Sequence, residues 1–173
     1  MTALNILPEC YVDTKVAEMI SQSSKYNHQH GCGQIANQLK NTFKNKVALG
    51  IIDEDRDKGP IANYFLEFIE VKSENGLILK RHTERAQYLI LICPEIEEWL
   101  LNNANFVEVD PIYYNLPKHL QEFKHITKKQ NINTNIGFYQ FIKTLLIKEA
   151  PGIITLRNWI EAFKENNLHR LNN

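Results

Sequence analysis

Apolar and polar positions alternate along the chain in blocks that predict an α/β fold. Residues 47–52 are apolar and rich in β-branched side chains, and they end abruptly at a run of carboxylates that begins with Asp53. An apolar run of this length bounded by charge is typical of a buried strand in a parallel sheet. Weaker runs predict further strands at residues 3–7, 25–30 and 88–92.

Between these strands the apolar spacing changes to a helical period. One helix is predicted from a cap at Asp13 or Thr14 to residue 21, a second over residues 34–44, and a third from Pro94 to residue 101. Strands that alternate with helices indicate right-handed crossovers and a parallel sheet. The expected fold class is therefore α/β, with a parallel sheet flanked by helices.

An antiparallel hairpin and a helical tail complete the predicted architecture. Residues 68–71 and 77–80 flank the turn residues Glu74, Asn75 and Gly76, which predicts a hairpin at one sheet edge. Beyond residue 102 asparagine and lysine become more frequent and the patterns become helical. The expected domains are an α/β domain over residues 1–104 and a helical C-terminal extension over 105–173 that packs on it.

Three helices are predicted in this extension. The first two cover residues 116–129 and 134–149, and Thr155 is expected to cap the last one. The apolar positions of the last helix recur at helical spacing and indicate core contact rather than a ligand site. These positions are Leu156, Trp159, Ile160 and Phe163.

Composition narrows the classes of protein that fit. The chain has 173 residues, of which 43% are hydrophobic, enough for one domain with a real core. The formal net charge is zero, so nucleic acid would have to bind through local patches and bound metal. The three cysteines form no Cys-x-x-Cys pair, which argues against a zinc ribbon or a disulfide framework. The first residues lack the pattern of a signal peptide and no stretch is long and apolar enough to span a membrane, so we expect a cytoplasmic protein.

The carboxylates after residue 52 are the strongest candidate site. Ligands of open α/β sheets bind beyond the carboxyl ends of the strands, where Asp53 and Asp55 are expected. Carboxylate oxygens are hard ligands that suit Mg²⁺ or Mn²⁺. A calcium loop fits less well, because the sixth and twelfth positions are Lys58 and Tyr64 instead of glycine and glutamate. A haloacid-dehalogenase phosphatase, whose Asp-x-Asp follows the first strand, and a simple solvated loop remain alternatives.

The order of these motifs resembles the Toprim domain. Glu9 ends the first predicted strand, Gly31 and Gly33 follow the second, and Asp53-x-Asp55 ends the third. Toprim domains carry a glutamate, usually followed by glycine, after the first strand and an Asp-x-Asp after the third; here Cys10 follows Glu9. Residues 96–101, Ile-Glu-Glu-Trp-Leu-Leu, are similar to a pattern late in the Toprim part of overcoming-lysogenization-defect nucleases and related phage-defence proteins. The resemblance covers residues 3–101.

The resemblance implies a function and a set of site residues. It implies a metal-dependent nuclease that hydrolyses phosphodiesters of DNA or RNA, with Glu9, Asp53 and Asp55 as ligands of Mg²⁺ or Mn²⁺ and Glu97 as a further catalytic carboxylate. The alternative is a non-catalytic or regulatory Toprim-like subunit of a complex that contains an ATPase. The chain has no Gly-x-x-x-x-Gly-Lys-Ser/Thr motif, so an ATPase would be a separate partner protein.

Other polar residues are weaker candidates for substrate binding. His28 and His30 share one face of an extended segment, where they would contact phosphate, bind a transition metal or serve as structural histidines. Lys80 and Arg81 follow a strand and are either phosphate contacts or an ordinary polar strand end. One predicted helix carries a basic face that can follow a phosphate backbone or be merely solvated. Its residues are Lys118, His119, Lys124, His125, Lys128 and Lys129.

Overall fold

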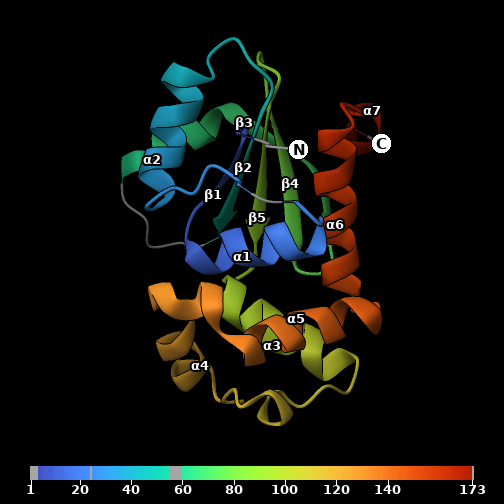
Figure 1. Ribbon diagram of the computed structural model, residues 1–173. Coiled ribbons are helices and arrows are strands. Elements are labelled where there is room, and N and C mark those ends of the chain that lie inside the picture. Colours follow the sequence, from blue (N-terminus) through green and yellow to red (C-terminus); the bar gives the residue numbers. More distant parts are fainter. Residues whose placement is uncertain (1–3, 24, 55–59, 173) are drawn as a thin grey trace.

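A five-stranded mixed sheet is the centre of the fold (Figure 1). The computed structural model describes residues 4–23, 25–54 and 60–172. Strands β1 (Ile6–Pro8), β2 (Ala48–Asp53) and β5 (Gln87–Ile92) are parallel to one another, whereas β4 (Leu77–His82) and β3 (Phe68–Glu74) continue the sheet antiparallel. The strand order is β1-β2-β5-β4-β3. The predicted α/β class is therefore confirmed, with a sheet that is only partly parallel.

Helices cover the sheet and extend beyond one of its edges. They are α1 (Tyr11–Ile20), α2 (Cys32–Asn37), α3 (Ile96–Phe106), α4 (Leu120–Thr127), α5 (Ile136–Ile147), α6 (Pro151–Lys164) and α7 (His169–Asn172). A π-helical turn, η1 (Gln38–Thr42), continues α2, and three short 3-10 helices are η2 (Pro60–Glu67), η3 (Pro111–Tyr114) and η4 (Gln130–Thr134). In Figure 1, α3, α4 and α5 lie below the tips of the parallel strands. No helix in the described part of the chain has the length and apolar character needed to cross a membrane.

Alternate residues of β2 build two different hydrophobic clusters. Leu49 and Ile51 face the larger cluster, whereas Ala48 and Ile52 face a smaller one covered by α2, η1 and η2. This alternation is what a strand covered on both faces requires. Gly50 lets α2 approach on the second face, since a Cβ there would meet the side chains of Leu89 and Ile35 at 2.7 and 2.9 Å.

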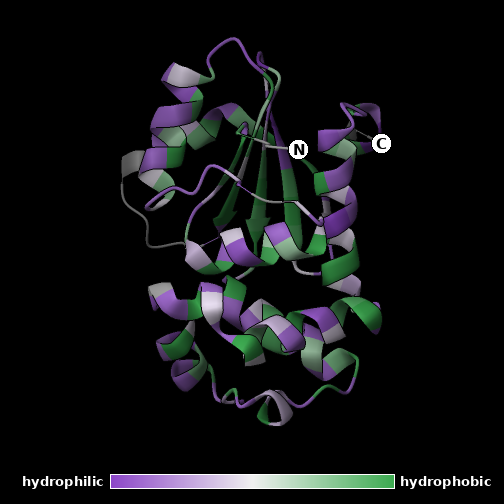
Figure 2. Ribbon diagram, viewed as in Figure 1, coloured by the Kyte–Doolittle hydropathy of each residue, from purple (hydrophilic) through white to green (hydrophobic). Residues whose placement is uncertain are grey.

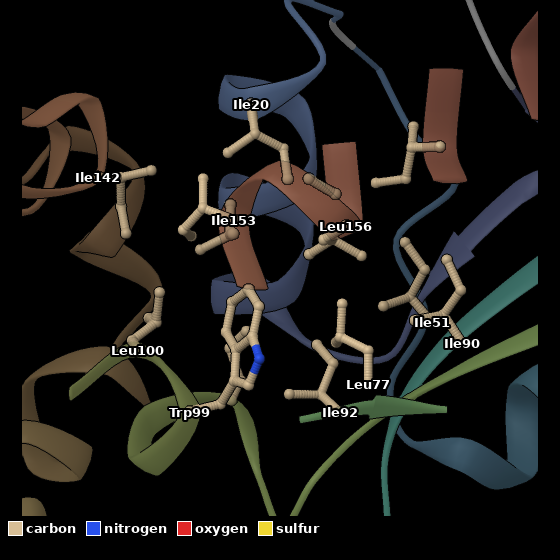
Figure 3. Close-up of a cluster of buried hydrophobic side chains, with 14 of the residues drawn as sticks. Ile20, Ile51, Leu77, Ile90, Ile92, Trp99, Leu100, Ile142, Ile153 and Leu156 are labelled. Atoms are coloured by element: carbon tan, nitrogen blue, oxygen red, sulfur yellow. The ribbon is translucent and has the colours of Figure 1, made fainter. Parts of the chain in front are cut away.

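The larger cluster joins the sheet to the C-terminal helices. Figure 3 shows side chains of β2, β4 and β5 packed against those of α1, α3, α5 and α6. The labelled residues are Ile20, Ile51, Leu77, Ile90, Ile92, Trp99, Leu100, Ile142, Ile153 and Leu156. Figure 2 shows mostly hydrophobic strands and helices that mix hydrophobic and hydrophilic residues. One continuous core therefore includes residues on both sides of residue 104.

The predicted hairpin and the stripe of the last long helix are confirmed. Strands β3 and β4 pair around Asn75 and Gly76, whose φ angles of +52° and +72° suit a tight hairpin turn. A Cβ at Gly76 would lie 2.8 Å from Trp99, so the turn also needs glycine for close packing. In α6 the predicted stripe from Leu156 to Phe163 is buried.

Several predicted element boundaries are wrong. Residues 25–30 form no strand, although Asn27 and Gln29 donate backbone hydrogen bonds to the carbonyls of β1. Helix α3 begins at Ile96 with Glu95 as its N-cap, so Pro94 precedes the helix instead of starting it. Thr155 lies inside α6 and accepts a hydrogen bond from the Asn75 side chain instead of capping the helix.

Candidate functional site

The parallel strands place the predicted carboxylates at one edge of the sheet. Residues 25–30 run along one side of β1 and are hydrogen-bonded to it. The chain then crosses over, and β2 pairs with the opposite side of β1. The carboxyl ends of strands at such a change of direction form the crevice where open α/β sheets bind ligands. Glu9 directly follows β1, and Asp53 is the last residue of β2. We call this place the acidic edge.

Glu9 is buried at the acidic edge and is held by two backbone amides. Its Oε1 accepts a hydrogen bond from the Cys32 amide (3.2 Å) and its Oε2 one from the Asp53 amide (3.1 Å). Bond lengths then limit the separation of the Glu9 and Asp53 carboxylates to about 8 Å. A single carboxylate thus joins the first residue of α2 to the end of β2.

Asp53 makes the corresponding contact to α3. Its Oδ1 accepts a hydrogen bond from the amide of Ile96 (2.9 Å), the first residue of that helix. The partial positive charge of a helix N-terminus stabilises a carboxylate in this position. Glu97 follows in the first turn of α3, is buried, and accepts a hydrogen bond from the Thr127 hydroxyl (2.6 Å). Glu98, one helical step of about 100° further on, is only half-buried.

Asp13 is a fourth carboxylate of the acidic edge, which sequence reasoning identified only as a helix cap. Its side chain is 2% exposed, and Oδ2 accepts a hydrogen bond from the Cys10 amide at the start of α1 (3.1 Å). Oδ1 is buried and has no hydrogen-bond partner among the described residues. Burial raises the pKa of Asp13 well above its usual range, and the negative charges of Asp53, Glu9 and Glu97 raise it further.

The ionised form of Asp13 is unfavourable at the acidic edge. Its carboxylate lies beside those of Asp53, Glu9 and Glu97, and it is buried too deeply for water to screen its charge. Among the described residues, the Lys124 ammonium pairs with Glu95, just before α3; the pKa of Lys124 is raised, first by its hydrogen bond to Glu95 and less by the charge of Glu97. A proton on Asp13 or a cation bound to it would remove this unfavourable charge.

The donor atoms fit a hard divalent cation. All are carboxylate oxygens, the ligands that Mg²⁺ and Mn²⁺ prefer, and Oδ1 of Asp13 is a buried acceptor that no described residue satisfies. Within the described ranges no three His, Cys, Asp or Glu side chains are already arranged around a common point as a metal site would be. Binding would thus require these side chains to turn toward the ion. Asp55, the third predicted ligand, lies outside the described residues.

His28 and His30 lie beside the first turn of α1. The His28 ring stacks on Tyr11 (4.3 Å between centroids) and meets His30 edge-on (4.8 Å). The Thr14 hydroxyl donates to the Cys10 carbonyl (2.7 Å), so it can only accept from Nδ1 of His28 (3.0 Å). Neutral His28 therefore carries its proton on Nδ1.

Burial affects both His28 and the neighbouring cysteine. Burial lowers the pKa of His28, and so does the charge of His30. Burial also raises the pKa of the Cys10 thiol, with a further contribution from Asp13, which leaves Cys10 protonated and unsuited to act as a nucleophile. A phosphate contact of His28 and His30 remains a prediction.

Lys80 and Arg81 lie away from the acidic edge. In the sheet Lys80 is opposite Leu89 and Arg81 is opposite Tyr88, whereas Asp53 is opposite Ile92 on the same strand β5. Three to four residues along a strand correspond to about 10–13 Å, and two strand spacings add about 10 Å sideways. The structure does not bring these two residues to Glu9 and Asp53, and their binding of substrate remains a prediction.

Comparison of the chain with protein-family models, with curated proteins and with solved structures gives no match. The Toprim resemblance therefore remains a prediction from the sequence.

Proposed function

We propose that the protein is a metal-dependent phosphodiesterase that cleaves nucleic acid at the acidic edge. The observation that carries the proposal is the buried Oδ1 of Asp13, which lies beside Asp53, Glu9 and Glu97 and has no hydrogen-bond partner among the residues that the structure describes. The carboxyl ends of parallel strands are where α/β sheets bind ligands, and four acids there favour a cationic one. The resemblance to the Toprim part of nucleases points to three of these residues, Glu9, Asp53 and Glu97, and to Asp55.

The residues that would hold a divalent cation are Asp53, Asp13 and Glu9. When bound, such an ion neutralises charge that develops on the phosphate oxygens and lowers the pKa of coordinated water. The chain's own contribution is orientation. Backbone amides of Cys32 and Asp53 hold Glu9, and the amide at the start of α3 holds Asp53, so both carboxylates stay at the carboxyl ends of the strands.

Asp13 and Glu97 have different roles in this proposal. The raised pKa of Asp13 makes it easier to protonate than an ordinary aspartate, and binding of a cation would favour release of that proton. Glu97 is held by Thr127 and adds negative charge beside the site.

The test is Asp53→Asn, with Asp110→Asn as its matched control. Both aspartates accept a hydrogen bond through Oδ1 from an amide at the start of a helix, Ile96 for Asp53 and Ile112 for Asp110, and an asparagine oxygen keeps that bond. Only Asp53 belongs to the acidic edge. We would measure melting temperature against Mn²⁺ concentration, and cleavage of labelled single- and double-stranded DNA and RNA.

The wild-type protein and Asp110→Asn should be stabilised by Mn²⁺ and should cleave at least one substrate. Asp53→Asn should lose cleavage and bind Mn²⁺ more weakly by more than about 100-fold, because changes to residues that only orient a metal ligand already cost up to about that much. Equal behaviour of the two variants would remove Asp53 from the mechanism. Binding of Mn²⁺ without cleavage of any substrate would refute the nuclease and support the regulatory subunit of an ATPase complex.

A further inference from the structure

The C-terminal end of α4 is attached to the acidic edge. Thr127, the last residue of α4, is buried and donates its hydroxyl proton to the buried carboxylate of Glu97. One turn earlier, the Lys124 ammonium pairs with Glu95 in front of α3. Two side-chain contacts therefore fix the end of α4 beside the acids.

The next segment of the chain connects α4 to a short helix, η4, that packs on α1. Lys128 and Lys129 follow Thr127 directly, and η4 comes next and packs on α1, with its Ile132 fully buried. The two lysines thus lie between α4, whose Thr127 binds Glu97, and η4, which packs on the helix that carries Asp13.

Residues 118–129 carry an excess of positive charge. Residues 118–129 contain four lysines and one glutamate, whereas the whole chain has a formal net charge of zero. Lys124 is engaged by Glu95, but Lys128 and Lys129 are exposed and pair with no carboxylate in the described part of the chain. Their ammonium groups are therefore available to an anion.

We propose that Lys128 and Lys129 bind the phosphates of a nucleic-acid strand next to the phosphate held at the acidic edge. This inference rests on the proposed function and specifies its substrate as a polymer. A small phosphate ester has no charged group beyond the phosphate that the metal ion would bind. A nucleic-acid strand has further charged phosphates on either side, which lysines outside the metal site can neutralise.

The experiment compares two double variants that remove the same charge. Lys128→Gln with Lys129→Gln removes the proposed contacts. Lys40→Gln with Lys44→Gln is the matched control, since both residues are exposed. Lys40 lies in η1 and Lys44 follows it; the Leu39 carbonyl of η1 accepts a hydrogen bond from Gln87, which starts β5 at the end of the sheet opposite the acidic edge. Binding of a labelled single-stranded oligonucleotide, as DNA and as RNA, is measured by fluorescence anisotropy at several salt concentrations, with Ca²⁺ in place of Mn²⁺. Melting in Mn²⁺ and hydrolysis of bis(p-nitrophenyl) phosphate are measured in parallel.

The Lys128 and Lys129 variant should bind the oligonucleotide about tenfold more weakly than the control at low salt. The slope of log affinity against log salt should fall by about 1.4, because each phosphate contact to a single strand contributes about 0.7. Hydrolysis of the small diester and stabilisation by Mn²⁺ should be unchanged.

Equal affinity and slope in the two variants, or no binding by the wild-type protein, would overturn the inference. In that case continued hydrolysis of the small diester would leave the proposed function intact. Failure of the proposed function has a different signature, namely no Mn²⁺ stabilisation and no hydrolysis by the wild-type protein.

Discussion

Replacing Asp13 with asparagine should stabilise the metal-free protein, and the gain should increase with pH. Asparagine keeps an oxygen that can accept the hydrogen bond from the Cys10 amide, so the start of α1 remains capped. It removes a buried acid whose ionised form is opposed by burial and by three neighbouring carboxylates. The fold should therefore lose a source of repulsion and no essential contact.

The sign and size follow from proton linkage. The pKa of Asp13 is higher in the folded protein than in the unfolded chain, so the folded state binds more protons between the two values. Wild-type stability then falls as pH rises through this window, by at most about 1.4 kcal/mol for each pH unit, and levels off above the folded pKa. Asp13→Asn lacks this dependence, so its advantage should grow at the same rate and reach a plateau.

The assay is urea unfolding at a series of pH values from about 5 to 9, in EDTA and again in Mn²⁺. Asp110→Asn serves as the control, because it makes the same chemical change at a helix start away from the acidic edge. In EDTA only Asp13→Asn should gain stability over wild type as pH rises. Saturating Mn²⁺, at about 100 times its dissociation constant, should add about 2.7 kcal/mol to wild type and much less to Asp13→Asn. Parallel stability curves of wild type and Asp13→Asn in EDTA would refute the interpretation that Asp13 is strained by charge.

Two further predictions concern stability away from the acidic edge. Gln87 is fully buried, accepts a hydrogen bond from the Tyr64 hydroxyl and donates to two backbone carbonyls, so Gln87→Leu should cost about 3 kcal/mol in urea unfolding. A loss below about 1 kcal/mol would show that these bonds matter little. Gly76→Ala should cost about 1–3 kcal/mol and shift tryptophan fluorescence, because Gly76 has a φ of +72° and its new methyl group would meet Trp99. An unchanged emission spectrum would mean that the hairpin turn moves instead of the indole.

Local sequence signals predicted much of the fold. The apolar run of β2, the Asn-Gly turn of the hairpin and the apolar stripe of α6 each depend on neighbouring residues, and each is present in the structure. Residues 25–30 show the limit of such signals. These polar residues donate isolated backbone hydrogen bonds to β1. Whether such a segment forms a regular strand depends on tertiary contacts rather than on the local sequence pattern.

The acidic edge was predicted only in part, for a similar reason. Asp53 was identified because it ends an apolar strand, whereas Glu9 and Glu97 were identified through the resemblance to Toprim domains. Asp13 was missed as a site residue, since its place in the first turn of a helix explains an aspartate fully without any site. Its position beside the other acids depends on how α1 crosses the end of the sheet, which no short pattern specifies.

Contacts between distant parts of the chain create the acidic edge. Glu9 and Asp53 are 44 residues apart, and Asp53 and Ile96 are 43 apart. The unfolded chain therefore has no comparable arrangement of carboxylates, and a compound that binds the acidic edge must bind the folded form preferentially. A collection of metal ions, nucleotides and phosphate esters can consequently be ranked by melting temperature alone, without knowing in advance which of them the protein transforms.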